Sequence, residues 1–114
     1  MEKKALSFEL ISNDDDNLSL VCFELCDGHF LTCRNLVESN PTYFELNNQS
    51  NCINSNNFKY IIEDNHLILF FSESISNKLK CESTLRIGYD MSEQEKKLLQ
   101  CCLEEIFSTA RADF

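Results

Sequence analysis

The side chains with the widest chemical range in this sequence are its seven cysteines and two histidines. Three cysteines and one histidine fall close together along the chain, at Cys22, Cys26, His29 and Cys33. Thiolate and imidazole are ligands that zinc prefers, and a cysteine beside a histidine is also the arrangement of a thiol nucleophile. The segment therefore raises two chemical hypotheses, a zinc site and a Cys-His catalytic pair.

The strand pattern of the same segment argues against zinc. Two β-rich runs meet at Asp27-Gly28, the pair typical of a two-residue type I′ hairpin. This predicts Cys26 opposite His29 and Cys22 opposite Cys33. Residues four apart on one strand are separated by about 13 Å, whereas zinc ligands lie about 2.3 Å from the ion. Cys22 and Cys26 therefore cannot share an ion, and we expect no metal site. One face of the hairpin should carry Cys22, Glu24, Cys26, His29, Leu31 and Cys33, and the other Val21, Phe23, Leu25, Phe30, Thr32 and Arg34.

A catalytic pair of Cys26 and His29, with Glu24 behind it, would lie at the rim of a hairpin without an enclosed pocket. The sequence contains no G-x-S-x-G or H-E-x-x-H motif, and its two glycines fall at a turn and at a strand end. We therefore expect neither an enzyme nor a cofactor. A thiol enzyme is a lesser alternative, which one unusually reactive cysteine would favour. We interpret the cysteines as reduced thiols of a cytoplasmic protein, since their number is odd and no secretion signal precedes them.

The chain is strongly acidic, with a formal net charge of −9. No cluster of basic residues is denser than Lys3-Lys4 or Lys96-Lys97, which disfavours nucleic-acid binding. The segment 12–17 contains Asp14, Asp15 and Asp16 but no glycine where a calcium loop must bend, so it reads as a solvated or partner-facing turn. An acidic surface suits a basic protein partner, although acidity can also serve solubility alone.

The elements that must position these residues follow from hydrophobic periodicity. Residues 1–12 predict a first strand with Leu6, Phe8 and Leu10 facing inward. The connection 35–40 should tuck Leu36 and Val37 inward, and 51–57 should be a mobile loop. Besides the first hairpin, the pattern predicts a strand over 42–46, a second hairpin (58–63 and 66–71) around Asp64-Asn65, a short helix over 72–80, a strand over 81–89, and a helix from a capping box at 92–95 to about Thr109.

The last helix determines the expected architecture. Its apolar stripe comprises Leu98, Leu99, Cys102, Leu103, Ile106, Phe107 and Ala110. Such a stripe has to cover an apolar sheet face. We therefore predict one α+β domain over residues 1–114, with an antiparallel sheet of about six to seven strands covered on one face by the C-terminal amphipathic helix. No apolar run approaches the ~18 residues that cross a bilayer, so we expect no membrane association.

The stretch Tyr43-Phe44-Glu45-Leu46-Asn47-Asn48-Gln49 joins the two hairpins. Together with the strand before it, the alternating segment 58–71 and the last helix, it resembles the immunity protein 10 family over roughly residues 18–107. Members of that family are small α+β proteins predicted to neutralise polymorphic bacterial toxins, including those of contact-dependent growth inhibition. The chain departs from the family at residues 52–55, where members often carry a tyrosine and two glycines.

The resemblance and the acidity together imply an immunity protein that occludes a cognate, basic toxin domain, for example a nuclease, as a monomer in a 1:1 complex. Partner contacts are expected at Asp14, Asp15, Asp16, Tyr43, Glu45, Tyr60, Glu63 and Asp64. Should Tyr43 and Glu45 be buried, a structural aromatic and a hydrogen-bonded carboxylate would replace their contact role. The alternative function is an acidic secretion or effector chaperone, although such chaperones resemble a helix-first, dimeric arrangement.

Overall fold

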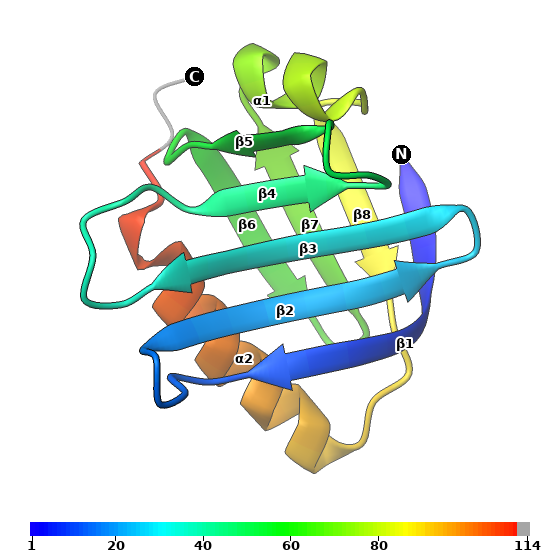
Figure 1. Ribbon diagram of the computed structural model, residues 1–114. Helices are drawn as coiled ribbons and strands as arrows, with labels where there is room; N and C mark the ends of the chain where they lie inside the picture. Colours follow the sequence, from blue (N-terminus) through cyan, green and yellow to red (C-terminus); the bar gives the residue numbers. More distant parts are fainter. Residues whose placement is uncertain (112–114) are drawn as a thin grey trace.

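The computed structural model describes residues 1–111, which form a sheet of eight strands and two helices (Figure 1). The strands are β1 (Glu2–Ile11), β2 (Leu18–Leu25), β3 (Gly28–Asn35), β4 (Tyr43–Leu46), β5 (Cys52–Asn54), β6 (Phe58–Glu63), β7 (His66–Phe71) and β8 (Thr84–Gly88). The helices are α1 (Glu73–Leu79) and α2 (Glu93–Ile106), and a 3₁₀ turn, η1 (Phe107–Thr109), follows α2. The sheet order is β5-β4-β3-β2-β1-β8-β7-β6. The predicted α+β class is confirmed.

The sheet folds over on itself along β1. Residues 2–4 of β1 pair in parallel with residues 86–88 of β8, whereas the rest of β1 pairs antiparallel with β2. A register shift between Ala5 and Ser7 separates the two halves, and such a bulge bends the strand. As a result β2 to β5 lie in front of β6 to β8 in Figure 1, and the apolar core fills the space between these layers.

Phenylalanines join the two layers. Phe44 of β4 is fully buried, and its ring centroid lies 4.9 Å from that of Phe58 on β6 and 5.3 Å from that of Phe71 on β7. Because side chains alternate along a strand, the inward position of Phe44 directs Tyr43 and Glu45 to the opposite, outer face of the sheet. The core packing of β4 thus decides where two of the predicted contact residues lie.

Helix α2 packs against β1, β2 and β3. It begins with the predicted capping box, in which the Glu95 N–H donates to Ser92 Oγ (3.2 Å) and the Ser92 N–H donates to Glu95 Oε1 (2.8 Å). Its buried stripe is Leu99, Cys102, Leu103 and Ile106. Leu98 is 41% exposed, contrary to expectation, because it lies about 100° around the helix from Leu99. The α-helix also ends at Ile106 rather than near Thr109, and η1 completes the segment.

The expected sheet was wrong in two respects. It has eight strands, not six or seven, and the pairing of β1 with β8 is parallel, so the sheet is mixed. The additional strand, β5, lies in the segment expected to be a mobile loop, and its three residues are too few to show an alternating pattern. The parallel pair joins the two ends of the strand sequence, and no local pattern encodes such a distant contact.

The first hairpin has the predicted faces but not the predicted register. Glu24, not Cys26, lies opposite His29, and Cys22 lies opposite Leu31. The loop consists of Cys26 and Asp27, while Gly28 already pairs with Leu25. A type I′ turn needs positive φ at both central residues. Within this hairpin only Gly28 has one, at +151°.

Two side chains expected to face inward are exposed. Leu6, at the bulge of β1, is 67% exposed because the extra residue interrupts the alternation, and Val37, in the connection after β3, is 73% exposed. Other predictions are confirmed. Glu63 pairs with His66 across the second hairpin, and α1 has Ser72 as its N-cap with Ile75 and Leu79 buried. Neither helix in the described part of the chain is long and apolar enough to cross a membrane.

Candidate functional site

The residues predicted to contact a partner lie in three separate places, and the fold does not gather them into one site. They are the turn between β1 and β2 (Asp14, Asp15 and Asp16), strand β4 (Tyr43 and Glu45) and the β6–β7 hairpin (Tyr60, Glu63 and Asp64).

On β4, Glu45 is only 6% exposed although it lies on the outer side of the sheet. Tyr43 Oη donates a hydrogen bond to Glu45 Oε1 (2.6 Å), and His29 Nε2 lies 2.5 Å from Glu45 Oε2. Tyr43 reaches the carboxylate because residues two apart share a strand face, and His29 reaches it from the neighbouring strand β3. Glu45 therefore has the structural role foreseen for a buried carboxylate, whereas Tyr43 is only half-buried and keeps some exposed surface.

These contacts shift the pKa values of Glu45 and Tyr43 in opposite directions. Burial acts to raise the pKa of Glu45, but the hydrogen bonds from Tyr43 and His29 outweigh it and hold that pKa below its ordinary value of 4.5. Burial, reinforced by hydrogen bonding to Glu45, raises the pKa of Tyr43 far above its ordinary value of 10.0. At neutral pH the pair consequently consists of a carboxylate and a neutral phenol, which matches the direction of the hydrogen bond.

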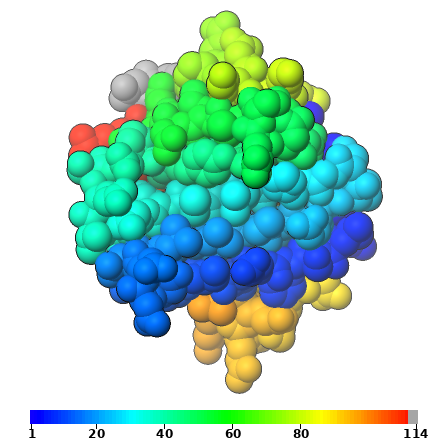
Figure 2. Space-filling model, viewed as in Figure 1, coloured from blue at the N-terminus to red at the C-terminus, as the bar shows by residue number. Residues whose placement is uncertain are grey.

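We define the outer face as the outward side chains of β1 beyond its bulge and of β2 to β5. Its members are Ser7, Glu9, Ile11, Leu20, Cys22, Glu24, His29, Leu31, Cys33, Tyr43, Glu45, Cys52 and Asn54. One row crosses all five strands, with Glu9, Cys22, Leu31, Glu45 and Cys52 successively opposite one another. Figure 1 shows that neither helix covers this face, and Figure 2 shows it as the continuous front surface of the molecule.

The outer face is acidic. Glu9 and Glu24 are exposed, and neither makes an ion pair or hydrogen bond within residues 1–111. Burial raises the pKa of the Cys22 thiol, and the charges of Glu24, Glu9 and Glu45 raise it further, which reflects three carboxylates around this thiol. Arg34 is the one lysine or arginine in β2 to β5, and it faces away, donating to the Glu105 carbonyl (2.9 Å).

The turn between β1 and β2 uses one of its three aspartates to hold its own shape. Asp14 Oδ1 accepts from the N–H groups of Asp16 and Leu18, each at 2.9 Å. Asp15 and Asp16 are exposed at the tip. The side chain of Asp14 thus forms the turn, and Asp15 and Asp16 are the two available to a partner.

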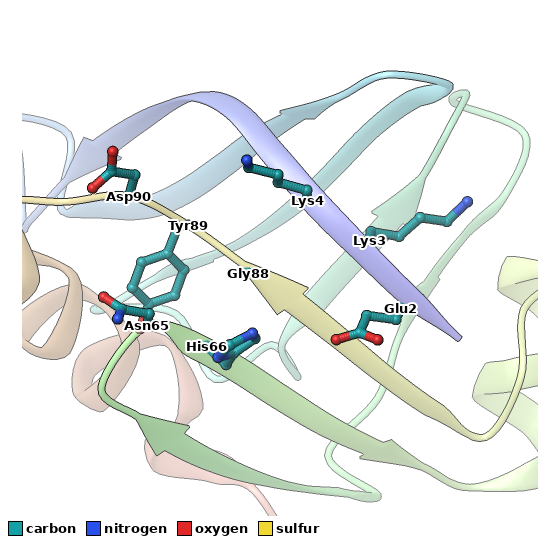
Figure 3. A pocket seen from close by; sticks show the side chains of 8 residues that line it. All are labelled: Glu2, Lys3, Lys4, Asn65, His66, Gly88, Tyr89 and Asp90. Atoms are coloured by element: carbon teal, nitrogen blue, oxygen red, sulfur yellow. The ribbon is translucent and has the colours of Figure 1, made fainter.

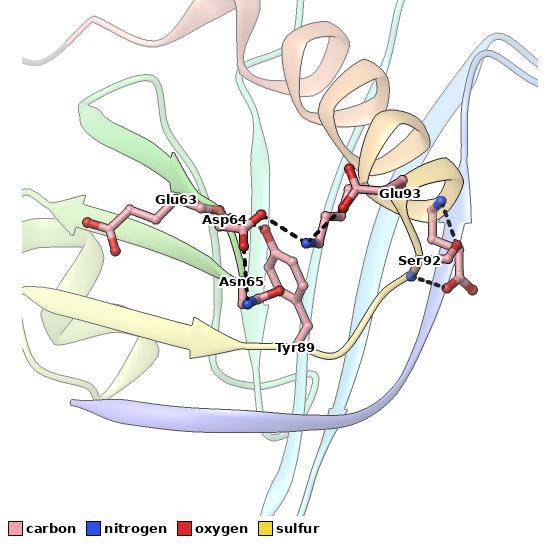
Figure 4. Close-up of polar contacts among 8 residues, drawn as sticks. Glu63, Asp64, Asn65, Tyr89, Ser92 and Glu93 are labelled. Carbon is pink, nitrogen blue, oxygen red and sulfur yellow. Dashed lines mark hydrogen bonds and ion pairs between the residues drawn. The ribbon is translucent and has the colours of Figure 1, made fainter.

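The carboxylates of the β6–β7 hairpin already face cations of the same chain. Lys96 Nζ donates to Asp64 Oδ1 (2.9 Å) and lies 3.5 Å from Glu93 Oε1 (Figure 4). Arg86 Nη2 lies 3.5 Å from Glu63 Oε2. The Tyr60 ring packs against Phe107, with centroids 4.8 Å apart. These contacts tie the hairpin to α2, β8 and η1, so its predicted contact residues have partners within the fold.

A groove of about 640 Å³ lies beside the same hairpin (Figure 3). Lys4 on β1, Gly88 on β8 and His66 on β7 lie opposite one another across its floor. Gly88 leaves the floor open, since an added Cβ would lie 3.2 Å from His66 Nε2. The rim carries both signs of charge, with Glu2 and Asp90 as well as Lys3 and Lys4, and so does not select one kind of ligand.

The structure shows where the residues of the zinc and Cys-His hypotheses lie. Within residues 1–111 no three His, Cys, Asp or Glu side chains are grouped so as to hold a metal ion. Cys26 lies exposed in the hairpin turn, and His29 directs Nε2 at Glu45. The sequence did not predict the contact of His29 with Glu45. This contact depends on the register between β3 and β4, and the irregular connection between these strands gives no indication of that register.

Comparison of the chain with protein-family models, curated proteins and solved structures finds no match. The assignment of a function therefore depends on the surface described above and on the sequence resemblance.

Proposed function

We propose that this protein is an immunity protein, which binds a cognate bacterial toxin domain and neutralises it by occlusion, without chemistry of its own. The partner is a basic protein domain, for example a nuclease, and each chain binds one copy in the cytoplasm. No nucleic acid, membrane or cofactor takes part.

The observation that carries the proposal is the excess of unpaired surface carboxylates. Glu9, Glu24, Asp15 and Asp16 are exposed and lack an ion-pair partner within residues 1–111, in a chain of net charge −9. Exposed charges of one sign raise the association rate of a partner of the opposite sign and disfavour acidic competitors. The resemblance of residues 43–49 to the immunity protein 10 family points to a toxin as that partner.

Co-expression tests this proposal. The probe is the C-terminal domain, about 150 residues long, of the protein encoded by the reading frame immediately upstream. Cells that produce this domain alone should stop growing, and cells that also produce the present protein should grow, with the two proteins purifying as a complex. Growth arrest that persists with both folded proteins present would contradict the proposal. An effector held only through a disordered segment, with no toxicity to relieve, would instead indicate the chaperone.

A further inference from the structure

We infer that the outer face is the surface on which this protein takes its partner, and that the partner presents a lysine or arginine to the gap between Glu9 and Glu24. The inference rests on the proposed function and adds to it the binding surface and the chemistry of the contact. Three features carry it: the arrangement of the two carboxylates, the apolar surface around them, and the state of the competing surfaces.

Glu9 and Glu24 are diagonal neighbours on adjacent strands. Glu9 lies opposite Cys22, and Glu24 lies two residues further along β2, opposite Ser7. Diagonal neighbours of this kind have Cα atoms about 7–8 Å apart. Both side chains project from the same face, so one ammonium or guanidinium group can approach both carboxylates.

This arrangement is unfavourable in the isolated chain. Like charges on neighbouring positions of one sheet face repel each other, and no lysine or arginine of β2 to β5 lies on this face to offset them. A cation supplied by a partner removes the repulsion and adds attraction. The two carboxylates therefore do not stabilise the isolated chain, whereas they would stabilise a complex with a basic protein.

The surface around the carboxylates is apolar enough to form the centre of an interface. Leu20, Leu31 and Tyr43 are half-buried at outward positions. The thiols of Cys22, Cys33 and Cys52 lie between them, also half-buried. These side chains stand on paired strands, and Tyr43 is further held by Glu45, so little conformational freedom is lost on binding. Interfaces combine such apolar anchors with a charged rim.

The competing surfaces are less suited to a basic partner. The carboxylates of the β6–β7 hairpin already contact Lys96 and Arg86, and the groove beside it carries both signs of charge. The acidic turn joins β1 to β2 at one end of the outer face, where Asp15 and Asp16 extend the negative rim. The outer face therefore offers unpaired charge and apolar area together.

Charge reversal tests the inference directly, with the upstream-encoded toxin domain as the probe. Glu9→Lys/Glu24→Lys should weaken binding by roughly 100-fold at low salt, about tenfold for each reversed charge. The matched control is Glu73→Lys/Asp90→Lys, which changes the net charge equally at two exposed residues outside the face and should bind within about threefold of wild type. Circular dichroism confirms that each variant is folded.

The native cysteines provide a second readout that needs no substitution. Complex formation should slow alkylation of Cys22 and Cys52, on the outer face, and leave Cys101, exposed on α2, unchanged. Two results would overturn the inference while leaving the proposed function intact. In the first, the toxin domain binds Glu9→Lys/Glu24→Lys as tightly as it binds the wild-type chain. In the second, complex formation protects Cys101 from alkylation in place of Cys22 and Cys52. A toxin domain that does not bind the wild-type chain would instead refute the proposed function.

Discussion

At the scale of single residues, Glu45 connects two strands through one carboxylate. Its two oxygens engage Tyr43 on the same strand and His29 on β3, and almost none of its surface reaches solvent. A buried carboxylate without such partners would be strongly destabilising. The three side chains therefore act as a unit that fixes the middle of the outer face.

Replacement of Glu45 should destabilise the fold. Glu45→Gln removes the ionised acceptor and brings an amide NH₂ group against a donor, so we expect the free energy of unfolding to fall by about 1–3 kcal/mol at pH 7. Urea denaturation measures this loss. Glu24→Gln is the matched control, because Glu24 is exposed and has no ion-pair or hydrogen-bond partner among residues 1–111, and it should change stability by less than about 0.5 kcal/mol. Equal effects of the two substitutions would show that the Glu45 hydrogen bonds contribute nothing.

The same carboxylate should make stability depend on pH. The pKa of Glu45 is lower in the folded chain than its ordinary value of 4.5, because Tyr43 and His29 bond to its ionised form. The contribution of Glu45 to the free energy of unfolding is therefore complete above the pKa that Glu45 has in the unfolded chain. It is lost as the pH falls from about 4.5 through the lower pKa that Glu45 has in the folded chain.

The stability difference between wild type and Glu45→Gln should accordingly shrink over that acidic range. Urea denaturation at a series of pH values measures this difference. A gap that stays constant down to the acid limit of folding would contradict the lowered pKa.

At the scale of elements, the sequence correctly predicted those caps and turns that depend on residues close together in the chain. The capping box at Ser92, the N-cap at Ser72 and the Asp64-Asn65 turn all form as expected, because each depends on neighbours within four residues. The register of the first hairpin was not predicted correctly, because Asp27-Gly28 also fits a turn with the glycine one position later. In the observed register Gly28 lies close to Asn47, where an added Cβ would not fit.

Gly28 should not tolerate a side chain. Its φ is +151°, and an added Cβ would lie 2.3 Å from Asn47 Oδ1 and 3.0 Å from Asn47 Cα. Backbone strain and steric overlap each cost about 1–3 kcal/mol, so Gly28→Ala should lower the free energy of unfolding by about 2–6 kcal/mol, measured by urea denaturation. Gly88→Ala is the control, since its Cβ would meet only a movable ring at 3.2 Å. A loss as large in Gly88→Ala would refute this account of Gly28.

At the scale of the whole molecule, the order of the strands was beyond the reach of sequence patterns. The parallel pairing of β1 with β8 brings together residues more than 80 positions apart, such as Glu2 and Arg86. Alternation within β2 and β3 did predict which of their side chains face outward. The extent of the outer face could not be predicted, because it depends on the bulge in β1 and on the pairing of β4 and β5. The outer face is formed by side chains of all five strands, so it can be identified only from the three-dimensional structure.

The charge distribution of the described residues supports the proposal that a basic partner binds to the outer face. Several carboxylates elsewhere face Lys3, Arg86 or Lys96, whereas those of the outer face and the acidic tip do not. Attraction between exposed charges weakens as salt shortens the screening length from about 30 Å at 0.01 M to about 8 Å at 0.15 M. Binding of a basic partner should therefore be strongly salt-dependent.

The most direct test of the central claim is calorimetric titration of the proposed toxin, the C-terminal domain encoded immediately upstream, into this protein at low and at physiological ionic strength. We predict one toxin domain bound per chain, a dissociation constant in the nanomolar range, and weaker binding at the higher salt concentration. The absence of binding by a folded toxin domain would contradict the claim that this protein neutralises it by occlusion. Tight binding that does not change with salt would contradict the role assigned to the unpaired carboxylates.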